Sequence, residues 1–140
     1  MQLCFDGEQV IREKGVCKVI FNRRKTQRAC HIFLEWLKQR ENWATKYAVS
    51  QFADTLNEGK HLWQNAPFRY SRRNFYMTIL KRLLGLGLLE IRPKYSESDQ
   101  HTHFVYAACL LDIPQRPPAQ GFCKYCYYIS CHWNHEFEAD

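Results

Sequence analysis

The chain is organised around the stretch S-R-R-N-F-Y-M-T-I-L-K-R-L-L-G-L-G-L-L-E-I, residues 71–91. Ser71 is suited to begin a helix, because its hydroxyl can accept a hydrogen bond from a backbone N–H of the first turn. Apolar residues then recur at spacings of three and four, which predicts one buried helical face. Gly85 and Gly87 favour the end of the helix, and the apolar residues 88–91 favour a short strand. The predicted buried face consists of Tyr76, Ile79, Leu80 and Leu83.

The opposite face of this predicted helix is polar and basic. Its side chains are of types that can reach phosphates or base edges. The surrounding chain carries one sign of charge, because no Asp or Glu occurs from Gly59 to Leu89. The polar face consists of Arg72, Arg73, Asn74, Met77, Thr78 and Lys81, and the other cations of the acid-free stretch include Lys60, Arg69 and Arg82.

The segment L-L-G-L-G-L-L, from Leu83 to Leu89, resembles the end of the third helix and the start of the next strand in the winged helix-turn-helix superfamily. In that superfamily a helix ending in leucine is followed by a few residues, a Gly-Leu pair and a strand that leads into the wing. The resemblance implies an α+β fold with three helices and a β-hairpin wing, in which the third helix reads DNA. It indicates the superfamily and no particular family within it.

The composition favours one domain with a polyanionic partner. The chain has 140 residues, 46% of them hydrophobic, and 20 Lys and Arg against 14 Asp and Glu give a net charge of +6. The odd count of seven cysteines, and an N-terminus without the basic and apolar regions of a signal peptide, favour a reducing, cytoplasmic location. The longest apolar run, Phe104 to Leu111, is far shorter than the roughly 20 residues of a membrane helix, so we expect no membrane partner.

Residues 1–24 are predicted to form a β extension ahead of the main domain. Asp6-Gly7 is typical of a tight hairpin turn, and the β-branched run from Val16 to Phe21 is typical of a strand. Two interpretations stay open for this extension: additional sheet for the core, or an arm for dimerisation.

The main domain is predicted to span residues 25–112, and a basic cluster stands at its start. Arg23, Arg24 and Lys25 precede the first predicted helix and can hold a DNA backbone. The alternative is an ordinary solvated junction, since such junctions are often basic.

Two helices are predicted before the central stretch. Thr26 is the predicted N-cap of a helix that continues to about Arg40. A second helix is predicted from Tyr47 to Asn57. The apolar faces are Cys30, Ile32, Phe33, Trp36 and Leu37 in the first helix, and Val49, Phe52, Ala53 and Leu56 in the second.

The connection from Glu58 to Tyr70 is long for a helix-turn-helix, in which the turn is usually a few residues. It carries Arg69, a candidate phosphate contact. Trp63, Phe68 and Tyr70 either fill the core beneath a long loop or form a platform on which a base can stack.

The wing is predicted after Ile91, as two strands that flank a polar tip. Arg92, Lys94 and His103 lie at its base, where a wing approaches a DNA backbone or minor groove. Acidic residues at the tip argue against deep insertion. His101 and His103 share a strand face, which permits a metal ion but is more often two solvated histidines.

Residues 113–140 are predicted to be a proline linker followed by a Cys/His-rich tail that binds structural Zn²⁺. The predicted ligands are Cys123, Cys126, Cys131 and His135, of which the first two form a C-x2-C pair suited to one ion at a tight turn. Metal would then supply the folding energy of so small a segment. The alternatives are a tail whose aromatic residues pack on the main domain, and an iron–sulfur cluster.

These patterns favour a double-stranded DNA-binding protein, most simply a transcriptional regulator acting as a homodimer. The chain lacks a Gly-rich phosphate loop, a zinc-protease motif and a carboxylate pair beside a base, so we expect no catalytic residues and no enzyme. The alternatives are an adaptor or small subunit of a larger nucleoprotein complex, as in a mobile or defence element, and a protein that binds single strands or RNA. The predicted DNA contacts are Arg23, Arg24, Lys25, Arg69, Arg72, Arg73, Asn74, Thr78, Lys81, Arg92 and Lys94.

Overall fold

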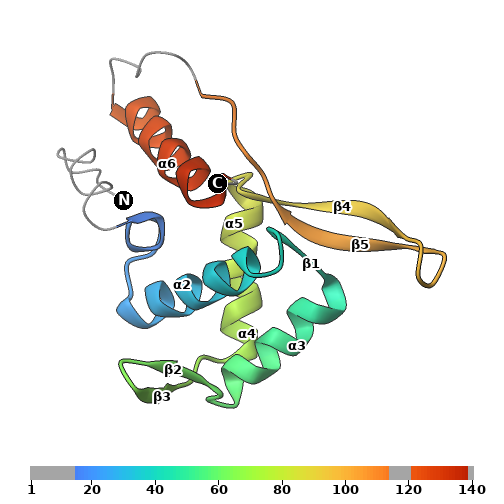
Figure 1. Cartoon of the computed structure of the whole chain (residues 1–140). Helices are drawn as coiled ribbons and strands as arrows, with labels where there is room; N and C mark the ends of the chain where they lie inside the picture. The colour runs from blue at the N-terminus through green and yellow to red at the C-terminus, as the bar shows by residue number, and fades with distance from the viewer. Residues whose placement is uncertain (1–14, 114–120, 139–140) are drawn as a thin grey trace.

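The structure is a computed structural model that describes residues 15–113 and 121–138, with side chains in the second range described from Cys126 onward. It is α+β, as predicted: helices surround a central helical segment, and a small antiparallel sheet extends into a long hairpin. Figure 1 shows the central segment running behind α2 and α3, with the β4–β5 hairpin projecting to one side. No helix of the described residues is long and apolar enough to cross a membrane.

Residues 15–20 are helical, so the strand predicted from Val16 to Phe21 is wrong. Val16, Cys17 and Ile20 recur at helical spacing and are all buried in the core. Burial of this face outweighs the weak β preference of branched side chains. The predicted hairpin at residues 3–11 lies outside the described residues.

Two cysteines join residues 15–20 to the next helix through a buried contact. The Cys17 thiol donates to Cys30 Sγ at 3.1 Å. Burial raises the pKa of Cys30 well above its usual value, so this thiol stays neutral. Cys30 therefore contributes to core packing and not as a reactive thiolate.

The helix α2 (Arg24–Lys38) begins before Thr26, so the predicted cap is wrong. Arg23 occupies the N-cap position without a side-chain hydrogen bond. Thr26 lies inside the helix and is buried, with its hydroxyl 3.1 Å from the Tyr70 hydroxyl. The buried residues of α2 are Thr26, Ala29, Cys30, Phe33, Leu34 and Leu37.

A short strand, β1 (Trp43–Thr45), leads directly into α3 (Lys46–Asn57). The Thr45 hydroxyl caps α3 by accepting from the Ala48 N–H at 3.0 Å. The predicted second helix and its inward face are confirmed, because Val49, Phe52, Ala53 and Leu56 are all buried.

The long connection after α3 contains a second hairpin, β2 (His61–Trp63) with β3 (Ala66–Phe68). Gln64 and Asn65 form its turn with positive φ angles of 52° and 64°, the backbone that a two-residue hairpin turn requires. This hairpin lies where a long loop was expected.

The central segment is one continuous run of three helical pieces: α4 (Arg72–Asn74), a π-helix η1 (Phe75–Leu80) and α5 (Lys81–Gly85). Ser71 is the cap, as predicted, and accepts from the Asn74 N–H at 3.0 Å. Phe75 is fully buried and Tyr76 only half-buried, so the buried face begins one residue earlier than predicted and includes Phe75, Ile79 and Leu83 at a spacing of four.

The sheet has the order β1-β5-β4, with all pairs antiparallel. Strands β4 (Leu89–Ser96) and β5 (His101–Ala108) form the predicted hairpin. The residues at the base of the hairpin, Leu89, Val105 and Ala107, are buried against the body, whereas most of the distal residues are exposed.

The last helix, α6 (Gly121–Phe137), packs on the main core. Trp133 is completely buried, and its indole N–H donates to the Cys109 carbonyl at 2.8 Å. The Asn134 side chain bonds the backbone N–H and C=O of Leu111 at 2.8 and 2.7 Å. Side chains of the tail therefore hold it against the main domain, as expected if the tail packs there.

Candidate nucleic-acid interface

The outward face of the central segment, residues 72–85, carries most of the predicted base-reading side chains. Arg73, Asn74 and Lys81 are exposed and Thr78 is half-buried, whereas Ile79 on the opposite side is fully buried. The outward face is thus basic and amide-rich, and the buried face fixes its position.

A groove lies beside this face and brings the two basic segments of the sequence together. Its volume is about 490 Å³, and no Asp or Glu of the described residues lines it. One wall is the junction before α2, which comprises residues 20–26 and includes the start of that helix. The other wall is the central segment, although about 50 residues separate the two in the chain. The lining residues are Ile20, Phe21, Asn22, Arg23, Lys25, Thr26, Tyr70, Asn74, Thr78 and Arg82.

Two contacts fix the walls of the groove relative to each other. One is the buried hydroxyl pair of Thr26 and Tyr70, at 3.1 Å. The other is Arg82, which donates to the Ile20 carbonyl at 3.2 Å and lies over the Phe21 ring at 5.8 Å. The groove is therefore preformed, and its exposed cations Arg23 and Lys25 stand on a rigid support.

Arg72 does not face the groove. Its guanidinium donates to the Ser50 carbonyl at 2.8 Å, to the Ser50 hydroxyl at 2.9 Å and to the Asp54 carboxylate at 3.0 Å. It also lies over the Tyr76 ring at 5.0 Å. The side chain therefore joins α4 to α3, an arrangement that conflicts with its predicted role as a base reader.

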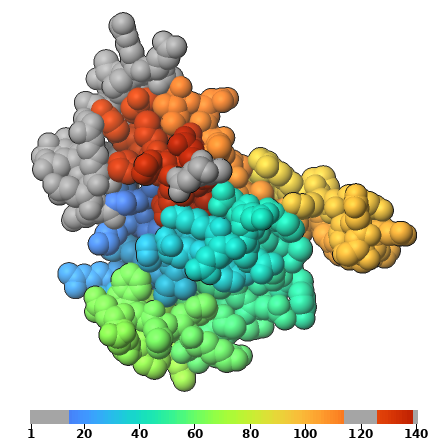
Figure 2. Space-filling model, viewed as in Figure 1, coloured from blue at the N-terminus to red at the C-terminus, as the bar shows by residue number. Residues whose placement is uncertain are grey.

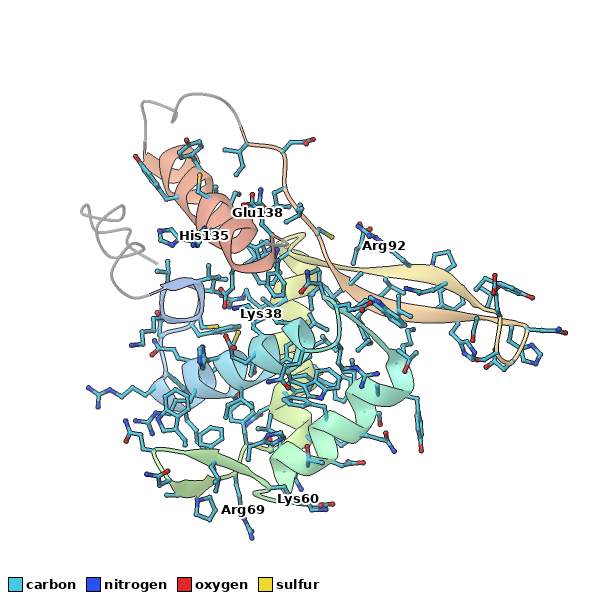
Figure 3. The ribbon with its side chains drawn as sticks, viewed as in Figure 1. Lys38, Lys60, Arg69, Arg92, His135 and Glu138 are labelled. Carbon is cyan, nitrogen blue, oxygen red and sulfur yellow. The ribbon has the colours of Figure 1, made fainter. Side chains whose placement is uncertain are left out.

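The other predicted contacts are spread along the molecule. Figure 3 shows Lys60 and Arg69 at the end near the β2–β3 hairpin, and Arg92 at the base of the β4–β5 hairpin. Arg69 is exposed and lies across Gly59, where an added Cβ would meet its Cγ at 2.8 Å. Arg24 faces a different hollow, between residues 15–18 and the β2–β3 hairpin.

The cations of the β4–β5 hairpin already have partners. The Arg92 guanidinium donates to the Glu90 carboxylate, and Lys94 Nζ is 3.6 Å from the centre of the Trp43 ring. At the tip, His103 Nε2 is 2.6 Å from the Asp99 carboxylate. The hydrogen bond from His103 lowers the pKa of Asp99, so this contact favours the carboxylate.

The predicted zinc ligands lie on α6 rather than around a tight turn. In a straight helix the 12 residues between Cys123 and His135 correspond to about 18 Å of rise, too far for one ion to bridge. The described residues contain no group of three or more His, Cys, Asp or Glu arranged for a metal, and the Cys123 side chain is outside them. Structural zinc stays a prediction, and it would require α6 to adopt another form.

Six lining residues of the groove were missing from the predicted contacts, and two of them, Arg82 and Tyr70, help to join its walls. Arg82 was noted only as part of the acid-free stretch, and Tyr70 only as a candidate for the core. Their role depends on the approach of the junction before α2, for which the sequence carries no local signal.

Comparisons do not add a family to this geometry: no protein-family model, curated protein or solved structure matches the chain.

Proposed function

We propose that this protein binds double-stranded DNA as a winged helix-turn-helix domain. The order of elements supports the proposal: helix α2, strand β1, helix α3, the helical segment 72–85 and then the β4–β5 hairpin. The resemblance at Leu83 to Leu89 implies this order, with the hairpin as the wing. The strand order β1-β5-β4 joins the wing to the body through β1.

The observation that carries the proposal is the acid-free groove between the junction before α2 and the central segment. Phosphate contacts position a protein on DNA, and polar side chains on an exposed helix read bases. Arg23 and Lys25 line one wall and are suited to phosphates. Asn74 and Thr78 line the other wall and are suited to base edges.

The structure revises the roles that the sequence suggested. Arg73 and Lys81 remain exposed candidates on the outward face. Arg72 becomes a positioning residue for α4, because its guanidinium is bound to α3. A homodimer acting in transcription is part of the proposal, since two half-sites are the usual route to useful specificity.

The test is the affinity of the whole chain for a blunt duplex at two or more salt concentrations. The double variant Arg23→Gln/Lys25→Gln should bind every duplex more weakly and should reduce the slope of log K against log salt by up to about 1.8. Arg40→Gln/Lys60→Gln is the matched control, because Arg40 lies over Trp36 and Lys60 pairs with Glu58, both outside the groove. Equal slopes for both variants and the parent would refute the groove as the interface.

A second candidate function is supported by an apolar face on the wing. Ile91, Tyr95 and Phe104 are 45%, 59% and 56% exposed, and the strand register places them on the same face of the hairpin. An exposed apolar face of this kind suits a protein partner. An adaptor would lose partner binding in Tyr95→Ser/Phe104→Ser while its duplex affinity stayed the same.

A further inference from the structure

A second hollow lies on the other side of the junction before α2. Its volume is about 750 Å³, within the range of small-molecule sites. Residues 15–18, the first turns of α2, the β2–β3 hairpin and α6 contribute to its walls. Asn22 lines both this cavity and the groove. The two hollows therefore lie on opposite sides of the junction and meet at this residue.

The charge of this cavity is positive. Among the residues that the structure describes, Lys18, Arg24 and Arg28 line it, with Glu136 as the one carboxylate. That carboxylate is 3.0 Å from Lys38 Nζ, which also pairs with Glu35 at 3.1 Å. Three cations thus stand against one carboxylate in the described lining, which favours a phosphate or another anion.

An aromatic side chain stands next to these cations. The Arg28 guanidinium lies 5.5 Å from the centre of the Trp63 ring, and His31 meets that ring edge-on at 5.8 Å. All three residues line the cavity. A base can stack on such a ring or on the guanidinium plane, and such stacking accepts any base because every base has a π-face.

Trp63 and Trp133 differ in the hydrogen bonding of the indole N–H. Trp133 donates its N–H to the Cys109 carbonyl at 2.8 Å. The Trp63 Nε1 is buried without a hydrogen-bond partner, and it alone has this state among the side chains that the structure describes. This N–H is itself inaccessible, so a ligand in the cavity would contact the Trp63 ring and not this donor.

Polar amides complete the recognition chemistry. Gln64, at the turn of the β2–β3 hairpin, and Asn22 line the cavity. An amide offers both donors and an acceptor, the combination that matches the edge of a base.

From this arrangement we propose that the cavity binds a nucleoside phosphate, with its phosphate on Arg24 and Arg28 and its base against Trp63. The nucleotide can come from two sources that share this chemistry: a free mononucleotide, or an unpaired nucleotide at the end of a nucleic acid whose duplex lies in the groove. The second source is favoured by the shared residue Asn22, because a strand leaving the groove there reaches the cavity directly.

The first experiment is calorimetric titration of the full chain with adenosine monophosphate, with inorganic phosphate and with adenosine. The monophosphate should bind more tightly than either fragment, and Arg28→Gln should weaken it at least tenfold. Arg40→Gln is the matched control, because Arg40 follows the C-terminal end of the same helix and its guanidinium lies 5.1 Å from the centre of the Trp36 ring, outside the cavity. Trp63→Leu should reduce the difference between the monophosphate and inorganic phosphate.

A second measurement distinguishes the sources. If the nucleotide belongs to a nucleic acid, the parent protein should prefer a duplex with a one-nucleotide overhang over a blunt duplex, and Arg28→Gln should lose that preference. Binding of the monophosphate without such a preference assigns the cavity to free nucleotide. Absence of both kinds of binding, or an equal loss in Arg28→Gln and Arg40→Gln, would overturn the proposal. Failure of blunt-duplex binding with the monophosphate still bound would refute only the groove.

Discussion

The junction before α2 and the β4–β5 hairpin both carry exposed cations that the sequence assigns to DNA, yet the structure gives them different surroundings. Arg92 and Lys94 are engaged by Glu90 and by the Trp43 ring. Among the described residues, no ion pair involves the cations of the junction, Arg23 and Lys25. A basic sequence therefore shows where positive charge lies, and the neighbours supplied by other elements decide whether a partner can use it.

The groove, of which the junction is one wall, and the hairpin also differ in how they are supported. The central segment beside the groove is anchored in the core by Phe75, whose ring centre lies 5.1 Å from that of Phe33 and 5.6 Å from that of Phe52. The distal hairpin projects away from the body (Figure 2). The groove is suited to fixed geometry, and the hairpin is suited to adapting its position.

The largest expected effect tests this difference in support. Phe75→Ala should lower the free energy of unfolding by about 3–5 kcal/mol, because it empties a fully buried aromatic site. Phe104→Ala, in the exposed hairpin, should change it by no more than about 0.5 kcal/mol. Denaturant unfolding followed by circular dichroism measures both. Similar losses in the two variants would show that the hairpin is part of the core.

The next effect separates two neighbouring arginines at the start of α4. Arg73→Gln should weaken binding to the best duplex by about 1–3 kcal/mol if Arg73 makes a base contact, with little change in stability. Arg72→Gln should instead cost about 1 kcal/mol of unfolding free energy, a modest value because the pair with Asp54 is partly exposed. The paired measurements are duplex titration and denaturant unfolding. The assigned roles are wrong if the two variants exchange these effects.

A smaller effect is expected from the cations of the hairpin. Arg92→Gln/Lys94→Gln should reduce the salt slope of duplex binding by less than Arg23→Gln/Lys25→Gln does, because both hairpin cations already have partners. Glu90→Gln sharpens the comparison, since it releases Arg92 and should increase affinity for any duplex. A hairpin variant that loses as much slope as the junction variant would make the two regions equivalent.

The sequence predicted the elements whose signals are local. The Ser71 cap follows from a hydroxyl at a helix start, and the second helix follows from apolar spacings of three and four. The β4–β5 hairpin follows from two strand-like segments that flank a polar tip. These signals involve neighbours in the chain, so one sequence is enough to reveal them.

What the sequence did not predict depends on distant contacts. Residues 15–20 form a helix because their apolar face meets the core, and Thr26 is buried because Tyr70 offers it a hydroxyl. Phe75 is an exception, because its spacing of four from Ile79, and of eight from Leu83, already places it on the buried face. The groove depends on distant contacts, since the approach of Arg23 to Asn74 is a property of the fold.

The zinc site predicted from the cysteine and histidine spacing stays a prediction. The predicted zinc site assumed a turn between Cys123 and Cys126, but both residues lie in α6. Trp133 and Asn134 anchor that helix to Cys109 and Leu111. Because packing holds the helix, a metal is not needed to account for its folding.

The smallest expected effect lies at the tip of the hairpin, in the contact between Asp99 and His103. The hydrogen bond from His103 is the main cause that lowers the pKa of Asp99, and the backbone N–H of His101 adds to it. A carboxyl group with a lowered pKa in the folded state stabilises that state at pH values above its unfolded pKa, about 3.9, and loses this contribution as the pH falls through the folded value. The order of the tip should therefore decrease under acid conditions, below about pH 4.

Carbon-detected NMR titration of the Asp99 carboxyl group measures this directly. Its midpoint should lie below about 3.9 in the parent protein and should move upward in His103→Gln, because the variant removes the principal hydrogen bond. An Asp99 midpoint that is the same in parent and variant would mean that the contact does not persist in solution. The tip would then be free to adapt its position, and the contrast between the rigid groove and the hairpin would become sharper.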